Sequence, residues 1–189
     1  MNNSIKVFLQ FCVLFVLIIA TSGCSPIVII EIEKYISYPV LKKIPLKIEL
    51  LLTEKFRSSG DVSYGRKYVI GRGLSENAKV LAEALFEHVT VTSSEAAVPT
   101  KAEAVLIPSL LAFRSTIPNL LWNDSKTILD IKWSLRDPDG KILWVSTIRG
   151  EGHGPYNKKY IQMVIDDLFQ KTFQRMSSSP EIRNYAISQ

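Results

Sequence analysis

The stretch LDIKWSLRDPDGKILWVSTI, residues 129–148, contains the clearest structural signal in the chain. Apolar and polar residues alternate from Leu129 to Leu135, as they do in a strand that has one face on a core. Asp137-Pro138-Asp139-Gly140 then supplies a turn, because proline restricts φ and glycine accepts a positive φ. Ile142–Ile148 returns as the partner strand, and Gly150, Gly152 and Gly154 are expected to end it. The stretch therefore predicts an antiparallel β-hairpin.

Other segments upstream have the patterns of strands. Leu46–Thr53 alternates cleanly, with leucine and isoleucine on one face. Ala104–Phe113 is apolar on both faces, which is typical of a strand flanked by other strands. Pro108 argues against a fully central position for that strand unless it lies at a bulge. Tyr64–Ile70 is expected to form a further short strand, and Pro26–Glu33 is also β-prone.

Two segments have the apolar spacing of amphipathic helices. The first runs from Ser75 to Val89, with Ser75 as a candidate N-cap. The second runs from about Tyr156 to Met176 and is expected to lie across the sheet. Ser177–Gln189 is expected to be a loosely ordered tail that Ile182 and Tyr185 can hold against the domain.

These elements predict an α+β fold: a two-layer sandwich with a mixed or antiparallel sheet of four to five strands and two helices packed on one face. The link through the first helix favours a right-handed crossover between the strands at Leu46 and Ala104. The opposite face of the sheet is then partly bare. The polar residues expected to cover it are Lys47, Glu49, Asp130, Lys132 and Ser134.

The start of the chain has the composition of a secretion signal. Lys6 precedes a largely apolar run from Val7 to Ala20, which is shorter than the ~20 residues of a bilayer-spanning helix. Thr21-Ser22-Gly23-Cys24 then resembles the lipobox of bacterial lipoproteins, with Thr21 at the position that is most often leucine in that family. The resemblance implies cleavage after Gly23 and acylation of Cys24. The alternative is an ordinary secreted protein in which small residues happen to precede a cysteine.

The lipobox divides the chain into three parts. The resemblance implies a signal peptide at residues 1–23, one periplasmic α+β domain tethered through Cys24 at residues 24–176, and a C-terminal tail at residues 177–189. Under this resemblance Cys12 would be removed with the signal and Cys24 would carry lipid. The folded part would then have no thiol for a disulfide or for a cysteine-ligated metal.

Basic residues are concentrated near the expected anchor. The segment from Glu31 to Arg72 contains nine Lys or Arg and five acidic residues. From Gly73 onward the chain contains thirteen basic and thirteen acidic residues. A positive surface held against a membrane attracts anionic head groups or lipopolysaccharide phosphates. The alternative is an ordinary solvated face, and nucleic acid is not expected as a partner outside the cytoplasm. The candidate residues for anionic lipid or partner binding are Lys34, Lys42, Lys43, Arg57, Arg66, Lys67 and Arg72.

The chain has no pattern that predicts catalysis, a metal site or a cofactor. His88 and His153 lie in no ligand spacing, and no serine stands in a G-x-S-x-G elbow. Gly71-Arg72-Gly73 begins like a dinucleotide-binding loop, but Glu76 occupies the place of the third glycine, where an acid would repel a pyrophosphate. A helix-entry turn explains this segment better. The chain is therefore not expected to be an enzyme, and a hydrolase is disfavoured.

The lipobox, the order of the elements and the helix entry at Gly73–Ala78 resemble small envelope lipoproteins, such as the lipopolysaccharide-assembly lipoprotein LptE and the auxiliary lipoproteins of lipid-handling ABC transporters. The resemblance implies a non-enzymatic accessory protein that binds a protein or lipid partner in an envelope assembly or transport system. Ser25 after the acylated cysteine implies the periplasmic face of the outer membrane, with the inner membrane as the alternative. The second hypothesis is direct binding of lipopolysaccharide or another anionic lipid through segment 34–72.

Overall fold

The computed structural model describes residues 27–29, 36–39, 42–63, 66–93, 101–116, 125–154 and 157–189. The lipobox and Lys34 lie outside these residues. The elements, in chain order, are β1 (Ile27–Ile29), β2 (Ile44–Leu51), α2 (Glu54–Arg57), β3 (Gly60–Ser63), β4 (Arg66–Val69), α3 (Gly71–Leu85), β5 (Phe86–Thr92), β6 (Ala104–Thr116), β7 (Ser125–Arg136), β8 (Ile142–Gly154), α4 (Lys158–Ser177) and α5 (Pro180–Ser188).

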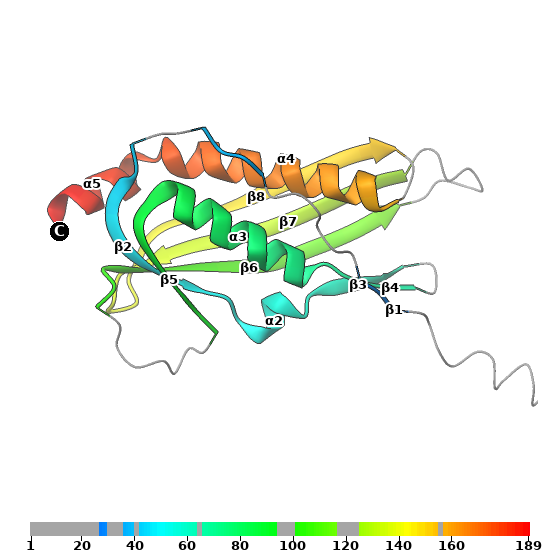
Figure 1. The fold of residues 1–189 in the computed structure, drawn as a ribbon, viewed down its shortest axis with the longest axis horizontal. Helices are drawn as coiled ribbons and strands as arrows, with labels where there is room; N and C mark the ends of the chain where they lie inside the picture. The colour runs from blue at the N-terminus through cyan, green and yellow to red at the C-terminus, as the bar shows by residue number, and fades with distance from the viewer. Residues whose placement is uncertain are drawn as a thin grey trace, which may run out of the picture.

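The described residues form an α+β fold with helices on one side of a five-stranded mixed sheet, which confirms the predicted class (Figure 1). The strand order in this sheet is β5-β2-β6-β7-β8. β2 runs parallel to both β5 and β6, whereas β6, β7 and β8 are antiparallel neighbours. A second, smaller sheet has the order β1-β4-β3 and lies at one end of the molecule (Figure 1). In the described residues, no helix has the length and apolar composition that a membrane span needs.

The predicted hairpin is confirmed as β7 and β8. The alternating residues Leu129, Ile131, Trp133 and Leu135 are all fully buried beneath the helices. The edge of the Trp133 ring meets Phe169 of α4, with 6.0 Å between the ring centroids. In the turn, Gly140 has a φ of 85°, and its N–H donates to the carbonyl of Asp137 at 3.0 Å. The turn chemistry and the buried alternation therefore fix the register of the two strands.

Of the three glycines expected to end β8, Gly154 is its last residue, whereas Gly150 and Gly152 lie within the strand and allow α4 to lie directly on it. A Cβ atom at Gly150 would be 2.5 Å from the carbonyl oxygen of Val164 and 2.6 Å from Cβ of Leu168. At the same end of α4, the buried Tyr160 hydroxyl accepts a hydrogen bond from the N–H of Thr127 at 3.0 Å. It also lies against the carbonyl oxygens of Ser125 and Gly152, so the helix is bonded to both strands.

The first predicted helix is displaced at both ends. α3 begins at Gly71, so Ser75 is not its N-cap: the Ser75 hydroxyl lies inside the helix and donates to the carbonyl of Gly71 at 2.8 Å. The helix ends at Leu85, and Phe86–Thr92 forms β5, because its β-branched residues suit a strand that can pair with β2. His88 is therefore an exposed residue of β5 rather than part of a helix end.

The C-terminal segment, expected to be loosely ordered, contains the helix α5. Ser179 is its N-cap and accepts a hydrogen bond from the N–H of Ile182 at 3.4 Å, and Pro180 stands at the first helical position. Ile182 is fully buried, and the Tyr185 hydroxyl donates to the carbonyl of Glu103 at 2.9 Å. Ile182 and Tyr185 therefore hold the segment against the domain as expected, but the segment is a helix rather than a loosely ordered tail.

Two further expectations concern the middle of the sheet. β6 pairs with β7 along its length but with β2 only at Ala104–Leu106, so among the described strands Pro108 pairs with β7 alone. A register shift follows between Leu110 and Ala112. On the sheet face away from the helices, Lys47 and Lys132 are exposed and Asp130 is partly exposed, as expected for a partly bare face. Glu49 and Ser134 are instead buried, at 8% and 6% exposure.

The contact between Gly150 and α4 predicts a specific loss of stability. Replacing Gly150 with alanine should lower the free energy of unfolding by about 1–3 kcal/mol, since the new methyl group meets helix backbone that cannot turn aside. Gly152→Ala is the matched control. There the nearest atoms belong to the side chains of Val164 and Tyr160, at 2.9 and 3.1 Å, and its loss should be smaller. Urea denaturation measures both, and equal losses would contradict the close backbone approach.

Candidate interaction site at the free edge of β8

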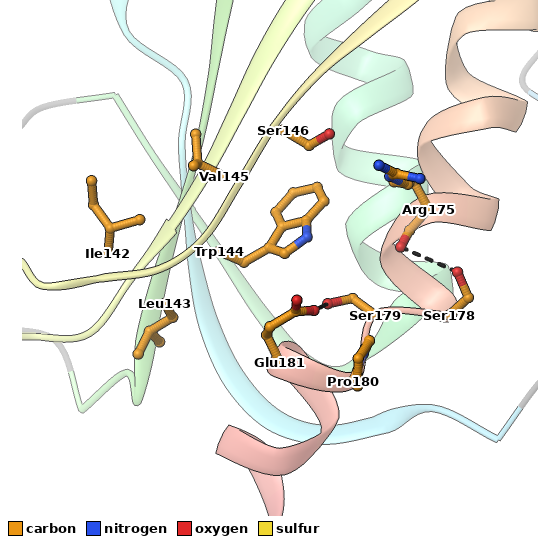
Figure 2. Close-up of a pocket in the computed structure, with 10 residues that line it drawn as sticks. All are labelled: Ile142, Leu143, Trp144, Val145, Ser146, Arg175, Ser178, Ser179, Pro180 and Glu181. Atoms are coloured by element: carbon orange, nitrogen blue, oxygen red, sulfur yellow. Dashed lines mark hydrogen bonds between the residues drawn. The ribbon is translucent and has the colours of Figure 1, made fainter.

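A groove follows the first half of β8, between this strand and the junction of α4 with α5. Its deeper part has a volume of about 450 Å³ (Figure 2). A shallower part of about 410 Å³ continues along the strand and shares Ser146, Arg175 and Ser178 with the first. We call the two together the β8 groove. Its lining comprises Ile142, Leu143, Trp144, Val145, Ser146, Thr147, Ile148, Arg149, Lys171, Gln174, Arg175, Ser178, Ser179, Pro180 and Glu181.

One wall of the groove is an edge of the sheet, because β8 is the last strand in the order that the described residues form. In an antiparallel strand, the N–H and C=O of one residue point to the same side, and the next residue points to the other. The N–H of Glu151 donates to Asp167 at 3.3 Å, and the carbonyl of Arg149 accepts from Lys171 at 3.4 Å. Odd-numbered residues of this part of β8 therefore turn their backbone groups outward.

The outer edge of β8 is covered at one end and open at the other. At Arg149 and Glu151, side chains of α4 bond the outward backbone groups. Val145 and Thr147 turn outward by the same alternation, and no described side chain bonds their backbone groups. This open part of the edge coincides with the β8 groove.

Three cations line the groove, and two of them are already paired with carboxylates. Arg149 of β8 turns its side chain to the sheet face away from the helices, where it makes a two-bond ion pair with Asp130, at 2.8 and 2.9 Å, and the hydrogen bond raises the pKa of Arg149 above its ordinary value. Lys171 pairs with Asp167 at 2.6 Å. Arg175, in contrast, makes no side-chain hydrogen bond or ion pair with any described residue. Figure 2 shows it beside the indole of Trp144, which projects from β8 into the groove.

The single acidic residue of the lining is held by its own helix. The hydroxyl of Ser179 donates to the carboxylate of Glu181 at 2.6 Å. This bond, the backbone N–H of Glu181 and the nearby charge of Arg175 lower the pKa of Glu181 below its ordinary value. The carboxylate thus completes the N-terminal cap of α5, and Arg175 remains the residue best placed to meet an anionic ligand.

The predicted site residues do not gather at this groove. Lys42 and Lys43 are exposed just before β2, and Arg66 and Lys67 belong to β4. Arg57 and Arg72 both line a separate hollow of about 500 Å³ between α2 and α3, which Glu54, Glu76 and Lys79 also line. β2 separates this hollow from Lys42 and Lys43, so the basic segment forms no single patch.

Other predicted features are placed clearly by the structure. Gly71 is a helix entry, as expected, and a side chain there would overlap the carbonyl oxygens of Phe56 and Arg57. His88 lies on β5 and His153 on β8, at opposite edges of the sheet. Across the described ranges, no group of three or more His, Cys, Asp or Glu side chains is arranged to hold a metal ion.

Comparison with known proteins adds the fold but no family. No family model and no curated protein matches the chain. The chain shares the fold of protein XCC0632. That protein, from Xanthomonas campestris and the family DUF330, has a TM-score of 0.58 and 8% identity over 86% of this chain and 98% of its own. For lipoprotein GNA1162 from Neisseria meningitidis, the TM-score is 0.43 and the identity 18%, over 71% of this chain and 100% of that protein. For lipoprotein B from Nitrosomonas europaea, the TM-score is 0.44 and the identity 14%, over 81% of this chain and 92% of that protein.

The cap of α5 predicts a pKa change that can be measured directly. Ser179→Ala removes the strongest interaction with the Glu181 carboxylate, so the pKa of Glu181 should rise toward its ordinary value. A carboxylate with a lowered pKa stabilises the fold at pH values above its ordinary pKa, and this contribution is lost as the pH falls through the lowered pKa. The variant lacks this contribution, so its free energy of unfolding should fall less on acidification. Carboxyl NMR titration measures the shift. Ser178→Ala is the control, since the Ser178 hydroxyl bonds only backbone carbonyls.

Proposed function

We propose that this chain is a bacterial envelope lipoprotein, anchored through acylated Cys24, which acts as a non-enzymatic accessory or binding component of an assembly or transport system. The lipobox-like residues Thr21–Cys24 support the anchor, and the β8 groove supports a binding role. The groove offers backbone hydrogen-bonding groups and an arginine, which are the means of holding a partner.

The observation that carries this proposal is that the small sheet, which follows Cys24, and the β8 groove lie at different ends of the molecule. β1 begins at Ile27, three residues after Cys24, and lies with the small sheet at one end of the molecule (Figure 1). The β8 groove lies at the other end, beside α5. Three residues span at most about 10 Å. An acylated Cys24 would therefore hold the small sheet close to the bilayer and present the groove to the aqueous compartment.

The finer placement follows the sequence. Ser25 supports delivery to the periplasmic face of the outer membrane, and the inner membrane is the alternative. An envelope protein is the partner that we expect at the groove. Several acyl chains on one cysteine form an anchor that hardly dissociates, because each buried methylene contributes about 0.8 kcal/mol.

The anchor is tested by exchanging the two cysteines separately. Cys24→Ser should leave the signal uncleaved and the protein without acyl chains, whereas Cys12→Ser should leave the mature lipoprotein intact, since Cys12 is removed with the signal. Mass spectrometry of the N-terminal peptide from the native membrane gives the answer. An N-terminus at Met1, or an unmodified sulfur at Cys24 in the unaltered protein, would overturn the proposal.

A second candidate function is binding of lipopolysaccharide or another anionic lipid through segment 34–72. The favouring observation is that four of the seven candidate cations lie beside the small sheet, the end that the anchor would bring to the bilayer. Arg66 and Lys67 are in β4, and Arg57 and Arg72 share the hollow between α2 and α3. Cations at a membrane surface contribute about 1 kcal/mol each.

This geometry predicts which substitutions weaken lipid binding. Arg57→Glu with Arg72→Glu should reduce the affinity for phosphatidylglycerol vesicles by about tenfold or more, as expected for the loss of two cations. Lys42→Glu with Lys43→Glu is the charge-matched control at the other end of β2, and it should change little. Vesicle sedimentation of the unacylated domain at two salt concentrations measures both. If neither pair changes binding, the lipid hypothesis fails.

A further inference from the structure

We propose that the open part of the β8 edge binds an extended, acidic segment of a partner protein, which adds to the sheet as a sixth strand. The proposal deepens the accessory role by naming the chemistry of the partner. It does not depend on the lipid anchor, because the groove and Cys24 are tested by separate measurements.

The backbone of β8 is prepared for a new strand. Val145 and Thr147 turn their N–H and C=O groups away from β7, and no described side chain bonds these groups. Two outward residues supply up to four main-chain hydrogen bonds to an added strand. Further along, Lys171 and Asp167 bond the outward groups of Arg149 and Glu151, so an added strand would have to end there.

The devices that usually protect an edge strand are missing from the open part. Edge strands are commonly blunted by proline, by a bulge or by charged side chains. Trp144–Thr147 contains none of these; the register shift lies just before it, because Leu135 pairs with Trp144 and Arg136 with Ile142. Val145 is 47% exposed and, like Thr147, is β-branched, which favours pairing with a neighbouring strand.

The charge of the groove indicates an acidic occupant. Arg149 and Lys171 already have carboxylate partners, so Arg175 is the cation of the lining that has no ion pair with a described residue. The acid of the lining, Glu181, is held by Ser179 in the cap of α5. The side chain of Ser146 lies on the helix side of the sheet, and an added residue opposite it would point toward Arg175. Asp or Glu at that position would form a charge-assisted hydrogen bond over the indole of Trp144 (Figure 2). Residues on either side would face Val145 and Thr147, where β-branched side chains fit.

The same charges disfavour a second copy of this chain as the occupant. Pairing two β8 edges about a two-fold axis near Ser146 would put Arg175 of both copies on the helix side of the same seam. Like charges at such an interface oppose association. A partner with acidic and β-branched residues in alternation satisfies both the backbone and the charge.

The test uses the mature lipoprotein in detergent and a capped octapeptide, acetyl-Thr-Val-Glu-Val-Glu-Val-Thr-Thr-amide. The peptide should bind, and amide exchange at Val145 and Thr147 should slow, while the same peptide with lysine in place of glutamate should bind at least about tenfold more weakly. N-methylation of the central valine removes one main-chain donor and should abolish binding without any change in the protein.

Three protein variants locate the contact. Arg175→Glu should weaken binding of the acidic peptide by about tenfold and restore binding of the lysine peptide. Thr147→Pro removes an outward N–H that β7 does not use and should abolish binding, whereas Thr147→Val should not. Circular dichroism checks the fold of each variant, and the N-methylated peptide keeps the test decisive if Thr147→Pro unfolds.

Several outcomes would overturn the proposal. Equal binding of the acidic and lysine peptides would remove the role of Arg175, and undiminished binding of the N-methylated peptide would exclude strand addition. Concentration-dependent dimers that are lost in Thr147→Pro would make a second copy the occupant. Each result leaves acylation of Cys24 unaffected, so failure here is distinguishable from failure of the lipoprotein assignment.

Discussion

The close contact between α4 and β8 is the constraint on which the rest of the structure depends. Four helical residues rise about 6 Å, nearly the same as two residues of a strand. Tyr160, Val164 and Leu168 therefore keep step with Gly154, Gly152 and Gly150, and each glycine leaves room for the helix. This contact covers the apolar face of the β7–β8 hairpin, including Trp133, with the apolar stripe of α4.

The same contact accounts for the β8 groove. On the N-terminal side of Gly150, the residues of β8 that face the helix have side chains, the nearest being Ile148. The helix can no longer lie on the strand, and the space between them becomes the groove that Arg175 borders. Where α4 is close, Lys171 and Asp167 reach the strand edge and cover it. The position of Gly150, the first of the three glycines in the sequence, thus decides which part of the edge is covered.

Local patterns were enough wherever burial and turn chemistry agree. The alternation in β7, the Asp137–Gly140 turn and the stripe of α4 were predicted, because each is set by neighbours in the chain. The boundary between α3 and β5 was not, since pairing with β2 changes the preference of Phe86–Thr92. The helix α5 had a readable signal, Ser179-Pro180-Glu181, that the tail interpretation overlooked.

The sequence by itself determined the α+β class, the two main helices, the hairpin and the candidate lipidation site, because these depend on periodicity and on short motifs. Only the tertiary structure decided that β8 is an edge strand of the described sheet and that Arg57 and Arg72 line one hollow while Lys42 and Lys43 lie apart. It also placed Arg175 opposite an open backbone. The physical reason is that an edge, a groove and a charge cluster arise from contacts between segments distant in sequence, which no local pattern contains.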